Sequence, residues 1–270
     1  MEFFAHHFYV LLLFLIATGF LSGFIDSISG GGGLISVPAL SLVGMPMASV
    51  LGTNKLQSSI GTSVAVLKYY RHGLLSFATV YRGLLFGLVG AICGAVLVNK
   101  VSNHFMVVLV PFVMLAVFIF NLFNKKIGIH AGKKRLSEPV FFSAFGFVLG
   151  FYDSFFGPGT GNFWLISIVF FLGYTFVEAA GYAKVLNLKS NLFSLIIFLY
   201  YGKVNFVYGF TMAIGQIAGN YCGAHMVILK GSKIVRPLFM TVVFFTILIM
   251  FYQLFSQTHA YPLQSFVIAS

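Results

Sequence analysis

The sequence predicts an all-α fold, a polytopic bundle of transmembrane helices. Apolar residues make up 59% of the 270 residues and charged residues only 8%, and the mean hydropathy is +0.99. Because an ordinary soluble domain carries about 25% charged residues, a water-soluble chain of this composition could not cover its surface. Apolar stretches near the length that a bilayer-spanning helix needs recur along the whole sequence. A transmembrane barrel would show short alternating segments instead.

An internal duplication is the second observation behind this prediction. Residues 19–32 recur at 146–159 with an offset of 127, and eight of the fourteen positions are identical. Each copy runs from an apolar stretch into an aspartate, a serine and several glycines. The match continues at an offset of 129, where Gly52 and Lys55 correspond to Gly181 and Lys184. The sequence therefore predicts two five-segment repeats, with helices broken at the glycine runs and a binding site between the halves.

The elements follow from the apolar stretches in chain order. The expected segments are 8–29, 33–45, 50–70, 77–98, 104–123, 139–156, 162–173, 180–201, 205–228 and 235–255. They divide the chain into a first membrane repeat (1–123), a basic cytoplasmic linker (124–138), a second membrane repeat (139–256) and a C-terminal tail (257–270). The first segment is not expected to be a signal peptide, because residues 1–7 lack Lys and Arg and residues 19–32 have a later counterpart.

The basic residues predict an orientation. The formal net charge is +11, and the richest cluster lies in the linker, where a cytoplasmic loop collects Lys and Arg. If the short segments 33–45 and 162–173 cross the membrane, Arg71 and the cluster from Lys230 to Arg236 also fall inside. This arrangement favours inverted repeats with both termini outside. If the short segments re-enter instead, the repeats would be parallel. Basic segment ends of this kind do not indicate nucleic-acid binding.

Two of the five carboxylates form a matched pair. Asp26 with Ser27, and Asp153 with Ser154, occupy the same places in the two copies. A carboxylate at membrane depth is costly, which favours a proton or cation site, or a partner for a buried lysine. The alternative is a helix cap, because Asp and Ser ahead of glycines can accept hydrogen bonds from free backbone N–H groups. The two roles, coupling and capping, are compatible.

The glycine runs predict unwound backbone inside the membrane. Four glycines cost about 3–4 kcal/mol relative to alanine in a helix, and such a break is tolerated only where backbone lines a cavity or is buried in protein. Free N–H groups and a half-helix N-terminus there suit an anion. The alternative, close helix packing, fits the spaced pairs Gly90 and Gly94, and Gly219 and Gly223, well, but it fits four consecutive glycines poorly. The candidate substrate-binding glycines are Gly30, Gly31, Gly32, Gly33, Gly157, Gly159 and Gly161.

A second matched charged pair consists of Lys55 and Lys184. Each lies a few residues into a long apolar segment, and Thr53, Asn54 and Asn187 are polar neighbours. Snorkelling to the membrane interface is one explanation. The other is that the lysines bind an anion or neutralise the aspartates, with the polar neighbours lining its path.

Several other chemistries lack their sequence patterns. No Gly-Lys-Ser or Gly-Lys-Thr follows the glycines, as an ATP-binding loop requires. The histidines are scattered, without the spacing of a zinc site, and nothing supports proteolysis by the paired aspartates. We therefore expect no enzyme activity, no cofactor and no metal. The two cysteines, Cys93 and Cys222, fall in mid-segment and are expected to be free, buried thiols.

Taken together, these residues resemble the sulfite exporter TauE/SafE family of bacterial membrane transporters. The resemblance rests on residues 23–27 leading to the glycines 30–33, on residues 52–55, and on their weaker second copies, over roughly residues 10–255. It implies a secondary carrier for small sulfur-containing anions, such as sulfite and sulfoacetate, without a nucleotide-driven partner. The second half departs from the pattern, because Pro158 and Thr160 interrupt its glycines.

The function expected from the sequence is secondary transport of a small anion across the bacterial inner membrane. The partners expected are the anion and the lipid bilayer, with no nucleic acid and with homo-oligomerisation left open. The alternatives are a passive anion channel and a carrier of a different small solute.

Overall fold

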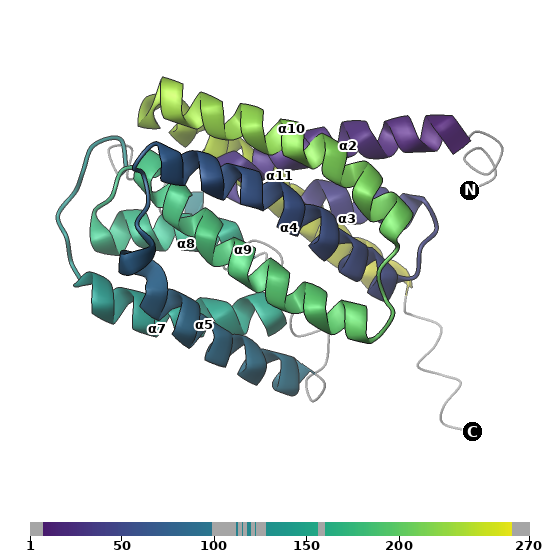
Figure 1. Cartoon of the computed structure of the whole chain (residues 1–270), viewed down its shortest axis with the longest axis horizontal. Coiled ribbons are helices and arrows are strands. Elements are labelled where there is room, and N and C mark those ends of the chain that lie inside the picture. The colour runs from purple at the N-terminus through teal and green to yellow at the C-terminus, as the bar shows by residue number, and fades with distance from the viewer. Residues whose placement is uncertain are drawn as a thin grey trace.

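A computed structural model describes residues 8–98, 128–155 and 160–260, together with Phe112, Leu115, Phe118, Ile119 and Leu122. The regular elements in these residues are helices (Figure 1). They are α2 (Phe8–Ser29), α3 (Gly33–Leu42), α4 (Met47–Arg71), α5 (Phe77–Val98), α7 (Glu138–Phe155), α8 (Thr160–Ser167), the π-helix η1 (Ile168–Leu172), α9 (Phe176–Tyr200), α10 (Phe206–Lys230) and α11 (Ser232–Ala260). The expected segment 104–123 lies largely outside the described residues.

The helices agree closely with the apolar segments expected from the sequence. Three of them are long and apolar enough to cross a bilayer, over Phe8–Ile28, Phe77–Gly94 and Phe176–Tyr200, and Thr160–Leu172 is a shorter apolar stretch. Large apolar side chains cover much of the outer surface, as expected for contact with lipid. In the part of the chain that the structure describes, the protein is therefore an all-helical membrane protein.

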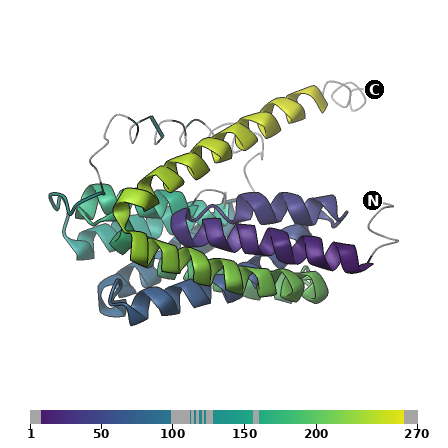
Figure 2. The same cartoon turned by 90° about the horizontal axis from the view of Figure 1, so that it is seen from above.

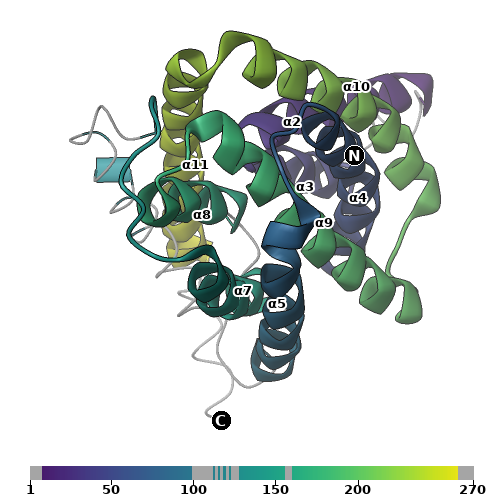
Figure 3. The same ribbon diagram turned by 60° about the vertical axis from the view of Figure 1, so that its left-hand side comes forward.

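Two helix pairs pack closely through glycines. Gly215 and Gly219 of α10 lie against the backbone of α2, and Gly90 and Gly94 of α5 lie against the backbone of α7, so a Cβ at any of the four would meet main-chain atoms. Figure 2 shows α10 alongside α2, and Figure 3 shows α5 alongside α7 with α4 and α9 between the two pairs. Small residues at these crossings allow the backbone approach that stabilises helix pairs in lipid.

The contacts also define which helix ends lie together. Near the start of α4, the Thr53 hydroxyl accepts a hydrogen bond from Asn205 N (2.9 Å), and near its end Lys68 Nζ donates to Tyr221 O (3.2 Å). Helices α4 and α10 therefore run in the same direction. Gly181, near the start of α9, faces Leu74 O just beyond α4, so α9 runs in the opposite direction.

The linker lies at the end of the molecule where α4 finishes. Phe176 N donates to Gly128 O (2.8 Å), and Arg135 N donates to Phe171 O (2.8 Å). Beside it, a hydrogen bond and ion pair with Lys134 (2.8 Å) hold the pKa of Glu138 below its usual range. In Figure 1 this linker lies on the left, whereas α2 begins and α11 ends on the right.

The cysteines correct one expectation. Cys93 and Cys222 are free thiols, as the sequence indicated, but both are exposed on the helix surface rather than buried. Their positions within apolar helices made burial the natural prediction. In a membrane protein, however, the outer face of a helix is as apolar as its inner face, so hydropathy does not tell the two apart.

Candidate functional site

Asp26 lies in the last turn of α2, where its side chain interacts with residues of two other helices. Its Oδ2 atom forms an ion pair with Lys184 Nζ of α9 (2.9 Å) and accepts a hydrogen bond from the Thr62 hydroxyl of α4 (3.2 Å). Asp26 is 6% exposed and Lys184 is 1% exposed. The ion pair is the lysine partnership expected as one role of Asp26, and the N-cap residue of α3 is Gly32, which has no side chain that could cap the helix.

The first glycine run connects α2 to α3 without helical structure. Gly30 has a φ of +84°, and its N–H donates to Asp26 O (2.8 Å). Ser22 and Ser36 both donate to the Gly32 carbonyl, at 2.8 and 3.2 Å, so this turn is held by side chains from both helices. A side chain at Gly30 would strain the turn, because the left-handed region penalises residues with a Cβ.

The turn after α2 touches the start of α8 in the second half of the chain. A Cβ at Gly30 would lie 2.5 Å from Gly161 Cα, and a Cβ at Gly161 would lie 2.6 Å from Gly30 Cα. Two glycine-rich regions far apart in sequence therefore meet backbone to backbone. Gly157 and Gly159 fall outside the described residues.

The polar residues predicted on α4 have different surroundings. The Asn54 Oδ1 atom accepts hydrogen bonds from Ser36 (2.6 Å) and Gln57 (2.8 Å), which ties α4 to α3. Thr53 instead lies against the start of α10, where it bonds Asn205. Lys55 Nζ donates to Asn191 Oδ1 of α9 (3.0 Å), a neutral partner.

The second half supplies its own aspartate. The Thr160 hydroxyl of α8 donates to Asp153 Oδ1 (3.0 Å), while Asp153 Oδ2 is buried with no hydrogen-bond partner. Ser27 donates within its own helix to Phe24 O (2.8 Å). Ser154 and Asn187 are both half-buried, and no hydrogen bond brings them to Asp153.

Several buried polar residues were not among the predicted site residues. Asn162 of α8 is fully buried, and neither its amide nitrogen nor its carbonyl oxygen has a hydrogen-bond partner. Lys189 of α9 also has a buried ammonium without a hydrogen-bond partner. Gln216 of α10 donates to Ser22 (2.8 Å) and accepts from Asn220 (2.7 Å). A search for every polar side chain within an apolar segment would have found them all.

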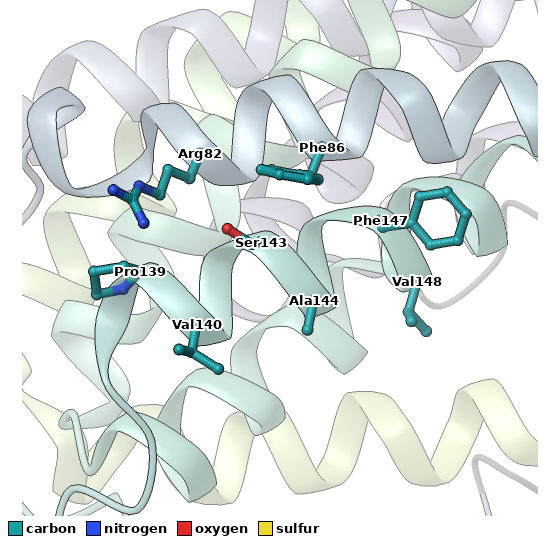
Figure 4. A pocket seen from close by; sticks show the side chains of 8 residues that line it. All are labelled: Arg82, Phe86, Pro139, Val140, Ser143, Ala144, Phe147 and Val148. Atoms are coloured by element: carbon teal, nitrogen blue, oxygen red, sulfur yellow. The ribbon is translucent and has the colours of Figure 1, made fainter.

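A surface groove lies apart from these polar groups. Figure 4 shows the groove between α5 and α7, with Arg82 and Pro139 at one end and Phe147 at the other. Its volume is about 670 Å³, and its lining is almost entirely apolar. Such a lining suits lipid rather than an anion, so the polar residues around the glycine contact form the better candidate site. No cluster of metal-ligating side chains occurs in the described part of the chain.

Comparisons with known proteins agree with this description. A family model described as sulfite exporter TauE/SafE matches residues 15–250. A probable membrane transporter protein of Haemophilus influenzae is 40% identical over 228 residues, covering 84% of this chain and 89% of the relative. The probable membrane transporter proteins ORF9 of a Sinorhizobium species and YfcA of Escherichia coli K12 are each 36% identical, covering 86% of this chain and 89% and 87% of the relatives. No solved structure shows a significant match.

Proposed function

We propose that this chain, which belongs to the sulfite exporter TauE/SafE family of membrane transporters, is a secondary carrier for a small anion. The substrate class is sulfite, a sulfonate or another sulfur-containing anion, and the membrane is the bacterial inner membrane. The bilayer and the anion are its partners. Transport draws on ion gradients and the membrane potential, because the sequence contains no nucleotide-binding loop.

The charge balance of the buried groups carries this proposal. Lys55, Lys68, Lys184 and Lys189 extend from apolar helices, whereas Asp26 and Asp153 are the two aspartates available to neutralise them. Lys184 pairs with Asp26, and Lys55 bonds only the neutral amide of Asn191. An excess positive charge in a low-dielectric interior is costly unless a counter-ion binds. A monovalent anion near Lys55 would reduce this excess positive charge.

The carrier would consist of two inverted repeats. Helix α2 runs parallel to α10, since Gly19 contacts Met212 and Gly223 contacts Phe24, and both helices begin at the end opposite the linker. Helix α7 begins at the linker, and it runs parallel to α5. The equivalent helices α2 and α7 therefore point in opposite directions, which supports the inverted arrangement and argues against parallel repeats.

The substrate site would lie where the two glycine regions meet. Backbone N–H groups of unwound segments bind anions well, and the contact between Gly30 and Gly161 places both regions at one point. The proposed substrate-binding residues are Gly30, Gly31, Gly32, Gly33, Thr53, Asn54, Lys55, Gly157, Gly159, Gly161, Lys184 and Asn187. Asp26 and Asp153, with Ser27 and Ser154, remain the proposed coupling or capping groups.

Flux in proteoliposomes tests the proposal. Vesicles containing the purified protein would be loaded with sulfite, methanesulfonate, chloride or a metal cation, and efflux would be followed with and without the same solute outside. A carrier gives saturable flux that external substrate accelerates, whereas a passive channel gives neither. An inside-negative potential should speed anion exit, since it contributes about 2.3 kcal/mol per charge at 100 mV. Flux restricted to metal cations would contradict the anion proposal.

A further inference from the structure

The two duplicated aspartates have different surroundings although their sequence contexts match. Asp26 Oδ2 has both an ion pair with Lys184 and a hydrogen bond from Thr62. Asp153 is equally buried, at 6% exposure, but its Oδ2 atom has no hydrogen-bond partner. One carboxylate is therefore compensated by a cation in direct contact, and the other is only half satisfied.

Lys189 is the cation that acts on Asp153. Their charges interact, yet no ion pair between them is formed within the described residues. The Lys189 ammonium is itself buried with no hydrogen-bond partner. A buried carboxylate oxygen and a buried ammonium thus face a common region without contacting each other.

The glycines of α5 and α7 create that region. Gly146, Gly150 and Asp153 are spaced by four and three residues, so they share one face of α7. Gly87 of α5 packs against this face, and a Cβ at Gly87 would collide with Lys189 Nζ. The ammonium therefore occupies space left by the absent side chain of Gly87, beside the face of α7 that carries Asp153.

Few other titratable groups reach Asp153 in the described structure. The Tyr152 phenol on α7 interacts with it, and Lys189 on α9 does so with the opposite charge. Helix α8 contributes the Thr160 hydroxyl, η1 is apolar throughout, and α5 contributes glycine backbone.

We propose that Asp153 is the carboxylate that binds and releases a proton during transport, with Lys189 as its counter-charge, while Asp26 stays ionised. Protonating Asp26 would break a formed ion pair and leave Lys184 buried without compensation. Protonating Asp153 breaks no formed ion pair. The proton of the neutral acid would sit on Oδ2, the oxygen that has no hydrogen-bond partner. This inference rests on the proposed function and assigns its coupling step to one half of the chain.

Carbodiimide labelling of the intact protein tests the inference without any substrate. Dicyclohexylcarbodiimide adds to a protonated carboxyl group in an apolar environment, and the adduct rearranges to a stable N-acylurea with no leaving group. Peptide mass spectrometry then compares Asp153 with Asp26 in the same sample. We expect at least about tenfold more label on Asp153 than on Asp26, and less label on Asp153 as the pH rises.

Two variants serve as matched controls. Lys184→Met removes the partner of Asp26 and should make Asp26 reactive, which shows that the reagent reaches it. Lys189→Met should increase labelling of Asp153 at alkaline pH. Equal labelling of the two aspartates in the wild type, or stronger labelling of Asp26, would overturn the inference whether or not either variant folds.

A transport experiment distinguishes failure of this inference from failure of the proposed function. In proteoliposomes, Asp153→Asn should exchange sulfite across the membrane but lose acceleration by a pH gradient. An Asp153→Asn protein that keeps this acceleration would refute the assignment and leave the carrier proposal intact. Absence of sulfite exchange in the wild type would instead count against the proposed substrate, and the labelling result would still decide the role of Asp153.

Discussion

Lys184 Nζ lies 2.9 Å from Asp26 Oδ2 and joins the middle of α9 to the end of α2. The pair connects the two halves of the chain at the glycine break, and both residues are buried. A lysine that serves as the partner of an aspartate does not snorkel to the interface. The buried pair therefore supports charge neutralisation over snorkelling as the role of Lys184.

Removing one member of this pair should be strongly destabilising. Lys184→Met leaves the buried Asp26 carboxylate with the Thr62 hydrogen bond but no counter-charge, for which we expect a loss of about 3–5 kcal/mol. The double variant with Asp26→Asn should recover much of this loss, because no unpaired charge remains. Thermal unfolding in detergent measures both effects. A wild-type melting temperature for Lys184→Met would show that the ion pair contributes little.

Lys55 should affect transport more than stability. Its ammonium bonds the neutral Asn191, and it is only half-buried, so Lys55→Ala should leave the protein folded while anion flux falls about tenfold or more. Asn191→Ala is the matched control, since it removes the partner and keeps the charge. Proteoliposome flux measures the difference, and equal rates for wild type and Lys55→Ala would indicate a lysine without contact to the anion.

Much of the helical framework could be predicted from the sequence, because the hydropathy of a segment indicates whether it lies in the membrane. The matched aspartates and lysines were likewise visible as costly charges in apolar segments. Lys189 was overlooked because the search relied on duplication, and the equivalent position in the first half is Ile60. Because Lys189 has no matching lysine in the first half, a search for matched residues could not find it.

The partners of individual polar groups were beyond prediction for a different reason. Thr53 and Asn54 are adjacent, yet successive residues on a helix point about 100° apart. Thr53 therefore bonds the start of α10, and Asn54 bonds α3. Which neighbour each one meets depends on how the helices are packed, and the sequence of one segment does not contain that information.

The contact between Gly30 and Gly161 should tolerate no side chain. Gly30→Ala combines a positive φ with a backbone collision, and Gly161→Ala meets the Gly30 main chain. We expect each to cost about 1–3 kcal/mol and to impair flux. Gly33→Ala is the matched control within the same run, because its Cβ would meet only Asn54 Nδ2 at 3.9 Å. Equal stability of all three variants, measured by thermal unfolding, would contradict the close approach.

The inverted arrangement predicts which helix ends face the cytoplasm. Single cysteines at Lys133, Lys203 and Lys230, in a background lacking Cys93 and Cys222, would be exposed to a membrane-impermeant thiol reagent on intact cells; all three positions are exposed in the structure. The linker lies at the end of α4, and α10 runs parallel to α4, so Lys133 and Lys230 belong to the same side. Lys203 belongs to the other side, since its carbonyl contacts Gly52 near the start of α4.

We expect the reagent to label the cysteine at 203 and to spare those at 133 and 230, because Lys and Arg gather on the cytoplasmic side. Permeabilised cells provide the control, since all three cysteines should then react. Labelling at 230 together with 133 in intact cells would keep the inverted repeat but reverse its orientation. Labelling at 230 together with 203 would place both ends of α10 outside, and the antiparallel relation of α2 and α7 would then be wrong.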